Sequence, residues 1–179
     1  MIRVEDFFDY IQYPKVVAES LQRFPDLVGF YDSKSQTKHL EDSLGFFFNF
    51  FEAQIKDCHI FSNLTEFNGH LDDWGESDHS VAKKMAELKW LTHDRAKPIF
   101  IHSINPNIVD LKDACRFIFK GFTYGDFFLF WPEEGLAAYP RNQGFGLIAK
   151  KTTPGINRAN AFLKTVKQSS FMDVEINCL

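Results

Sequence analysis

The chain has 179 residues, of which 45% are hydrophobic and 25% are charged, with only seven prolines and ten glycines. This composition excludes a disordered chain, a collagen-like repeat and a low-complexity linker, and it predicts a single globular domain over residues 1–179. The net charge of −4 at pH 7 argues against general affinity for nucleic-acid phosphates. The charge is uneven, because residues 1–90 carry −7 and residues 91–179 carry +3.

The first 38 residues predict two short helices and a strand. Apolar side chains recur at helical spacing at Val4, Phe7, Phe8 and Ile11. Pro14 then suits the first turn of a second helix, so we expect helices over about 4–11 and 14–23. The short apolar run 26–31 predicts the first strand, and the polar residues 32–38 predict a loop.

Residues 39–56 carry the widest apolar stripe in the chain. The stripe residues are Leu40, Leu44, Phe47, Phe48, Phe51 and Ile55. They recur every three or four positions, as on one face of a helix, and Phe46 and Phe50 widen that face. We therefore expect a central helix with Phe47 and Phe51 buried by the sheet.

The middle of the chain predicts alternating strands and helices. We expect a strand over 58–64, a long loop over 65–78 and a helix over 79–92 with Asp78 as its N-cap. A strand at 99–101 precedes a second helix in this region. Asp110 is predicted to cap that helix, and Gly121 to follow its C-terminus.

The last third predicts three strands and a helix. The apolar or alternating runs 126–131, 136–139 and 145–150 are separated by turn residues, which is typical of an antiparallel meander. Pro154 then introduces a final helix. The predicted fold class is α+β: a single domain, with a mostly antiparallel sheet and a C-terminal three-stranded meander packed by about five to six helices.

The cysteines and the N-terminus predict a cytoplasmic protein. Cys58, Cys115 and Cys178 have no CxxC spacing and are expected to be reduced thiols. The N-terminus is acidic where a signal peptide would be basic. The longest wholly apolar run, 127–131, is far shorter than the roughly 18 residues of a membrane span, so we expect no membrane association.

Residues 59–102 contain five of the six histidines, interleaved with acids. Imidazole and carboxylate together bind divalent metals, so His70 and His79 are candidate ligands, although their spacing matches no zinc motif. The alternative function is therefore a small-molecule or metal-dependent enzyme that uses this segment. The chain has neither a Gly-x-Ser-x-Gly elbow nor a glycine-rich phosphate loop, and we expect no cofactor.

Two loops combine tryptophan with carboxylates. The candidate binding residues are Asp72, Asp73, Trp74 and Glu76 in the first loop and Trp131, Glu133 and Glu134 in the second. A large rigid ring with a charged rim is typical of protein-binding surfaces. The leading hypothesis is a non-enzymatic domain that engages a basic protein through these acidic loops, with Trp74 as the anchor and no oligomeric state implied. The competing interpretation places the Trp74 ring in the core.

Residues 116–151 also carry a resemblance. They contain GDFFLF at 125–130, AAYPR at 137–141 and GLIAK at 146–150. This stretch resembles the closing meander of small uncharacterised bacterial proteins, some of them similar to immunity proteins of toxin systems. The resemblance brings no catalytic residue with it, and it implies a small acidic protein that occludes a toxin.

Overall fold

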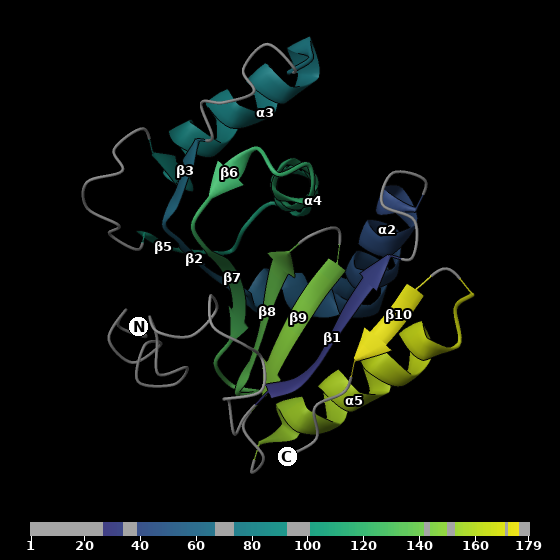
Figure 1. The fold of residues 1–179 in the computed structure, drawn as a ribbon. Coiled ribbons are helices and arrows are strands. Elements are labelled where there is room, and N and C mark those ends of the chain that lie inside the picture. The colour runs from purple at the N-terminus through teal and green to yellow at the C-terminus, as the bar shows by residue number, and fades with distance from the viewer. Residues whose placement is uncertain are drawn as a thin grey trace.

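The computed structural model describes residues 27–33, 39–66, 74–92, 101–141, 144–149, 153–170 and 172–175. Its centre is a seven-stranded antiparallel sheet in the order β10-β1-β9-β8-β7-β2-β5 (Figure 1). In chain order these strands are β1 (Leu27–Ser33), β2 (His59–Ser62), β5 (Ile101–Ile104), β7 (Phe127–Trp131), β8 (Leu136–Arg141), β9 (Gly144–Ala149) and β10 (Met172–Glu175). The structure is therefore α+β.

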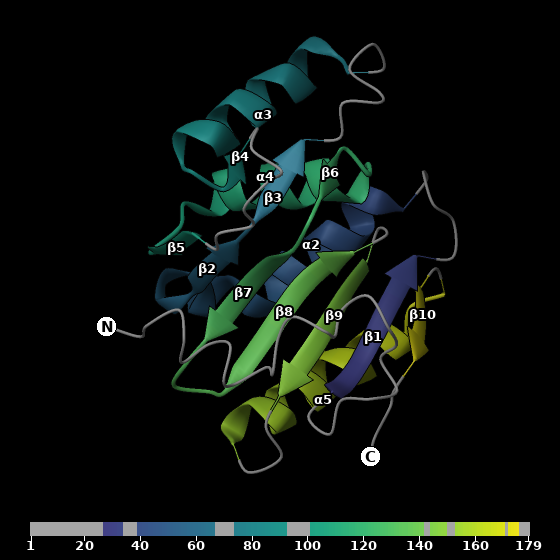
Figure 2. The same cartoon turned by 60° about the vertical axis from the view of Figure 1, so that its left-hand side comes forward.

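The helices that touch the large sheet lie on one side of it. They are α2 (Leu40–Phe51), which continues as the 3₁₀ helix η2 (Glu52–Asp57), α4 (Ile108–Phe119) and α5 (Pro154–Lys167). Helix α5 contacts β1, β8, β9 and β10, α2 contacts β1 and β9, and α4 contacts β8. Helix α3 (Glu76–Glu87) packs against α4, farther from the sheet (Figures 1 and 2).

A second sheet joins three short strands beside α3. Strand β3 (Leu64–Glu66) pairs in parallel with β4 (Leu91–Thr92) and antiparallel with β6 (Thr123–Tyr124). Asn63 alone separates β2 from β3, and its backbone N–H donates to Asp126 O (3.1 Å) while its side-chain oxygen accepts from Asp126 N–H (2.6 Å). Gly125 has φ +99°, and a Cβ there would lie 2.7 Å from the Asn63 side-chain oxygen. Glycine therefore permits the close approach at which the chain changes sheets.

The core beneath the large sheet is built from aromatic rings. Phe47 is fully buried and stacks on Phe145 with ring centroids 3.8 Å apart. Phe51 is also fully buried and stacks on Trp131 at 4.9 Å, and Phe162 of α5 packs against both α2 rings. The predicted burial of Phe47 and Phe51 is confirmed, because the apolar stripe of α2 faces the sheet.

The predicted arrangement of five to six helices around a C-terminal meander is wrong. The described residues form four α-helices and one 3₁₀ helix, and they form two sheets. Strands β7, β8 and β9 do pair in succession, but they lie within the seven-stranded sheet, and both α5 and β10 follow them in the chain. The predicted helices at 4–11 and 14–23 lie outside the described residues.

The predicted starts of two helices are also displaced. Helix α3 begins at Glu76 with Gly75 as its N-cap, and Asp78 is the third helical residue. Helix α4 begins at Ile108, and its N-cap is Asn107 instead of Asp110. In both cases the acid lies in the first turn, where the positive end of the helix dipole also favours a negative charge.

Candidate functional site

Polar and apolar groups meet at the surface of the α3–α4 pair. Helix α4 begins at this surface because the Asn107 side-chain oxygen accepts hydrogen bonds from the backbone N–H groups of Val109 (2.8 Å) and Asp110 (3.4 Å). Helix α3 begins there because the Asp78 carboxylate accepts from the Gly75 N–H at 3.2 Å. Each bond satisfies a backbone donor that has no partner inside its helix.

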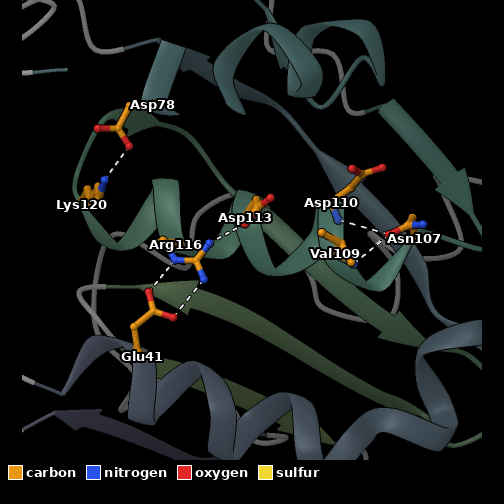
Figure 3. Close-up of polar contacts among 8 residues, drawn as sticks. All are labelled: Glu41, Asp78, Asn107, Val109, Asp110, Asp113, Arg116 and Lys120. Carbon is orange, nitrogen blue, oxygen red and sulfur yellow. Dashed lines mark hydrogen bonds and ion pairs between the residues drawn. The ribbon is translucent and has the colours of Figure 1, made fainter. Parts of the chain in front are cut away.

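Ion pairs hold α3 and α4 together at both ends. Lys120, at the C-terminal end of α4, lies 2.5 Å from Asp78 in the first turn of α3 (Figure 3). Lys84, in the last turn of α3, lies 3.9 Å from Asp110 in the first turn of α4. The two helices are therefore antiparallel, and all four charges lie at the helix end whose dipole stabilises them.

Arg116 extends this charged surface to α2. Its Nε donates to Glu41 Oε1 at 2.5 Å and its Nη2 to Glu41 Oε2 at 2.9 Å, and Nη1 also donates to Asp113 (Figure 3). The hydrogen bond from Arg116 holds the pKa of Glu41 below its ordinary value. The same bond raises the pKa of Arg116. This bidentate pair fixes α2 relative to α4.

A hollow of about 240 Å³ opens between α3 and α4. Its lining residues are Ser80, Val81, Lys84, Met85, Leu88, Asp110 and Asp113. Val81 and Leu88 are half-buried and Met85 is buried, so the floor is apolar, while the Lys84–Asp110 pair forms part of the rim. We call this hollow the α3–α4 groove. Val109, next to Asp110 in the chain, is 61% exposed and adds an apolar side chain at the start of α4.

The first predicted binding loop is only partly described. Asp72 and Asp73 lie outside the described residues, and Glu76 is exposed as the first residue of α3. Trp74 is only 8% exposed, and its ring packs against Phe117 at 5.0 Å and Phe122 at 5.4 Å. An anchor must reach its partner, whereas this ring fills space beside α4.

The second predicted loop presents one exposed carboxylate. Trp131 is 3% exposed, and its indole N–H donates to Gln54 O at 2.9 Å. Glu134 is half-buried and pairs with Arg158 of α5, while Glu133 is exposed. Of the seven predicted binding residues, the structure therefore shows Glu76 and Glu133 at the surface.

The histidine-rich segment shows no metal-binding arrangement within the part of the chain that is described. His79 is exposed on α3 with its ring 5.2 Å from that of Trp74, and His70 lies outside the described residues. The thiols of Cys58 and Cys115 are buried, and burial raises the pKa of both. Thiols held in the protonated form are poor nucleophiles.

Comparison of the chain with protein-family models, with curated proteins and with solved structures finds no match. Among the described helices, none is long and apolar enough to cross a membrane. The sequence analysis did not predict the groove. The residues that bear on it are Asp78 and Asp110 in the first turns of α3 and α4, and Lys84 and Lys120 at the C-terminal ends of these helices. An acid in the first turn of one helix can pair with a lysine at the C-terminal end of the other only if the two helices are antiparallel, but each helix's own dipole favours the same charges, so the pattern alone did not identify the pair.

Proposed function

We propose that this chain is a non-enzymatic protein-binding domain whose contact surface is the α3–α4 groove. The observation that carries the proposal is the apolar floor of Val81, Met85 and Leu88 beneath the Lys84–Asp110 pair. An apolar centre within a polar rim is the usual composition of a protein interface. The exposed Val109 side chain enlarges the apolar area that a partner would bury.

The partner that we propose is a basic protein. The groove lining contains two acids, Asp110 and Asp113, and one base, Lys84, so it carries a net charge of −1 even though Asp110 pairs with Lys84. Glu76 adds an exposed carboxylate at the start of α3. The net charge of −4 favours the approach of a cation in the same way. The resemblance of residues 116–151 to immunity-like proteins would make this partner a toxin. The free thiols of Cys58 and Cys115 support a cytoplasmic site of action, where thiols stay reduced.

A titration followed by amide chemical shifts tests the groove. The probes are a lysine-rich peptide that carries leucines on one helical face and an acidic peptide with the same leucines. We expect the basic peptide to shift the amide signals of Val81, Lys84 and Asp110, and Val81→Asp to abolish those shifts. The control variant is Lys164→Gln on α5, whose side chain is exposed away from the groove. Equal shifts with both peptides, or shifts that Val81→Asp leaves intact, would contradict the proposal.

The identity of the partner as a toxin has its own test. If the gene beside that of this chain encodes a toxin, the two purified proteins should form a stoichiometric complex that inhibits it. We expect Val81→Asp to weaken this complex by at least about tenfold, as the loss of a buried interface contact does. A toxin that binds wild type and Val81→Asp equally well would remove the groove from the interface.

A further inference from the structure

Two of the ion pairs at the α3–α4 groove are electrically neutral. Lys84 lies 3.9 Å from Asp110, and Lys120 lies 2.5 Å from Asp78, so each pair joins one base to one acid. Asp110 lines the groove, but a lysine of the same chain already lies beside its carboxylate. Because opposite charges close together cancel at a distance, these two pairs attract a partner's cation only weakly.

A third cluster, made by Arg116 with Glu41 and Asp113, has excess negative charge. Arg116 donates to both carboxylate oxygens of Glu41, at 2.5 and 2.9 Å, and to Oδ1 of Asp113 (Figure 3). One guanidinium therefore serves two carboxylates, and the cluster keeps a net charge of −1. Glu41 takes two of these three hydrogen bonds, because the planar fork of arginine matches a carboxylate. Asp113 receives the smaller share of the arginine's donors.

Asp113 is the acid of this cluster that reaches the groove. Its side chain is 37% exposed and lines the hollow, whereas Glu41 belongs to α2 and is not a lining residue. Among the described residues, the side-chain contacts of Asp113 use Oδ1 only, so Oδ2 keeps its capacity to accept a hydrogen bond. The excess negative charge is therefore open to a partner at this carboxylate.

The register of the two helices places Asp113 at one end of the apolar floor. The Lys84–Asp110 contact lies where the antiparallel helices α3 and α4 run side by side. One turn back along α3 from Lys84 is Val81. One turn forward along α4 from Asp110 is Asp113, which therefore lies across the groove from Val81. Leu88 lies at the other end of the floor, two turns or about 10 Å from Val81.

We propose that Asp113 selects the partner's basic side chain, and that the partner presents this side chain beside apolar residues on one face of a helix. The inference rests on the proposed function and names the chemistry that the groove recognises. An amphipathic helix laid in an apolar groove is a common mode of recognition. Apolar residues over two turns of such a helix cover the floor, and a lysine or arginine one turn beyond them reaches Asp113.

Two helical peptides of the same composition test this selection. Both carry three leucines at spacings of four and three residues, which match those of Val81, Met85 and Leu88. The first peptide has a lysine one turn beyond each end of the leucines on the same face, so either direction of binding brings one lysine to Asp113. The second has both lysines on the opposite face.

Titrations followed by amide chemical shifts give the two dissociation constants. We expect wild type to bind the first peptide about threefold to fivefold more tightly than the second, which is the contribution of an exposed ion pair. The preference should shrink with added salt, because exposed charges are screened. The carboxyl carbon signal of Asp113 should move with the first peptide and stay in place with the second.

Variants of the chain locate the carboxylate that receives the lysine. Asp113→Asn removes the charge with little change of size and should bind both peptides equally. Glu87→Gln is the matched control, because Glu87 is exposed on α3, does not line the groove and loses the same charge. This control should keep the preference for the first peptide. If Asp113→Asn fails to fold, the carboxyl carbon signal in wild type decides the question.

Failure of this inference is distinguishable from failure of the proposed function. If both peptides shift the amide signals of Val81 and Lys84 but bind wild type equally, the groove remains the contact surface and selection by Asp113 is wrong. A preference that survives in Asp113→Asn also overturns the inference, because another acid then receives the lysine. If neither peptide shifts these signals, the proposed function fails together with the inference.

Discussion

The core beneath the large sheet and the α3–α4 pair are stabilised by different interactions. In the core, fully buried rings stack at centroid distances of 3.8 Å for Phe47–Phe145 and 4.9 Å for Phe51–Trp131. In the α3–α4 pair, the contacts at the two ends are ion pairs, and part of the apolar surface between them remains open. The core should therefore determine global stability, whereas the pair can take up a partner without disturbing the sheet.

Removal of an aromatic ring from the core should lower the free energy of unfolding more than the other substitutions considered. We expect Phe47→Ala to lower the free energy of unfolding by about 3 to 5 kcal/mol, since a cavity adds to the lost transfer free energy. Urea denaturation followed by circular dichroism measures this change. The matched control is Phe46→Ala on the same helix, where the ring is half-buried and the cost should be smaller. Equal costs at the two positions would show that the stack on Phe145 is not the dominant contact.

Loss of the Asp78 carboxylate should lower the free energy of unfolding by an intermediate amount. The Asp78 side chain is largely buried, pairs with Lys120 and accepts the Gly75 N–H, so Asp78→Ala should cost about 1 to 2 kcal/mol. Asp78→Asn keeps an oxygen for the Gly75 N–H but removes the charge. In urea denaturation, the difference between wild type and Asp78→Asn then isolates the ion pair with Lys120, and the difference between Asp78→Asn and Asp78→Ala isolates the hydrogen bond from Gly75. If Asp78→Ala unfolds at the wild-type urea concentration, α3 is not held by these contacts.

Loss of the Glu41–Arg116 pair should lower the free energy of unfolding least, and the loss should depend on pH. Because the folded pKa of Glu41 lies below its ordinary value of 4.5, its stabilisation is fully present above about pH 4.5 and is lost as the pH falls through the folded pKa. Glu41 is mostly exposed, so the contribution is at most about 1 kcal/mol and falls with added salt.

Denaturation at pH 7 and pH 3 measures this contribution. Glu41→Gln should be less stable than wild type at pH 7, and the difference should shrink at pH 3. Glu52→Gln, an exposed position with the same change of charge, is the control. A stability difference for Glu41→Gln that persists unchanged at pH 3 would contradict the assignment.

The helices α2 and α5 could be predicted from the sequence because each buries one face, which places apolar residues at helical spacing. The stripe of α2 and the Pro154 start of α5 are both found in the structure. The N-caps were placed three residues too late because aspartate suits the first turn as well as the cap. At the start of α4, the sequence Asn105-Pro106-Asn107 already carried the better capping residue.

The strands that were missed lack a local pattern of sufficient length. Strands β4 and β6 have two residues each, too few for alternation to be seen. Strand β10 does alternate, with Met172 and Val174 apolar, but it has only four residues, and the sequence analysis treated the residues after the last predicted helix as a tail. The position of β1 between β9 and β10 depends on contacts across most of the chain, which no local window contains.

The candidate site was harder to predict than the fold. A tryptophan between carboxylates can face the solvent or the core, and the composition of the loop is the same in both cases. Phe117 and Phe122, more than forty residues away in the chain, place the Trp74 ring inside. The groove likewise depends on which faces of α3 and α4 meet, and this is decided by tertiary packing.

The placement of β1 has a consequence for how the chain folds during synthesis. Strand β1 leaves the ribosome early, but its two neighbours, β9 and β10, begin only at residues 144 and 172. At about 5 to 20 residues per second, translation of the intervening stretch takes roughly 6 to 20 s, during which β1 has neither neighbour. The large sheet can therefore close only after β10 has been made, and an unpaired β1 is a template for wrong strand pairing until then.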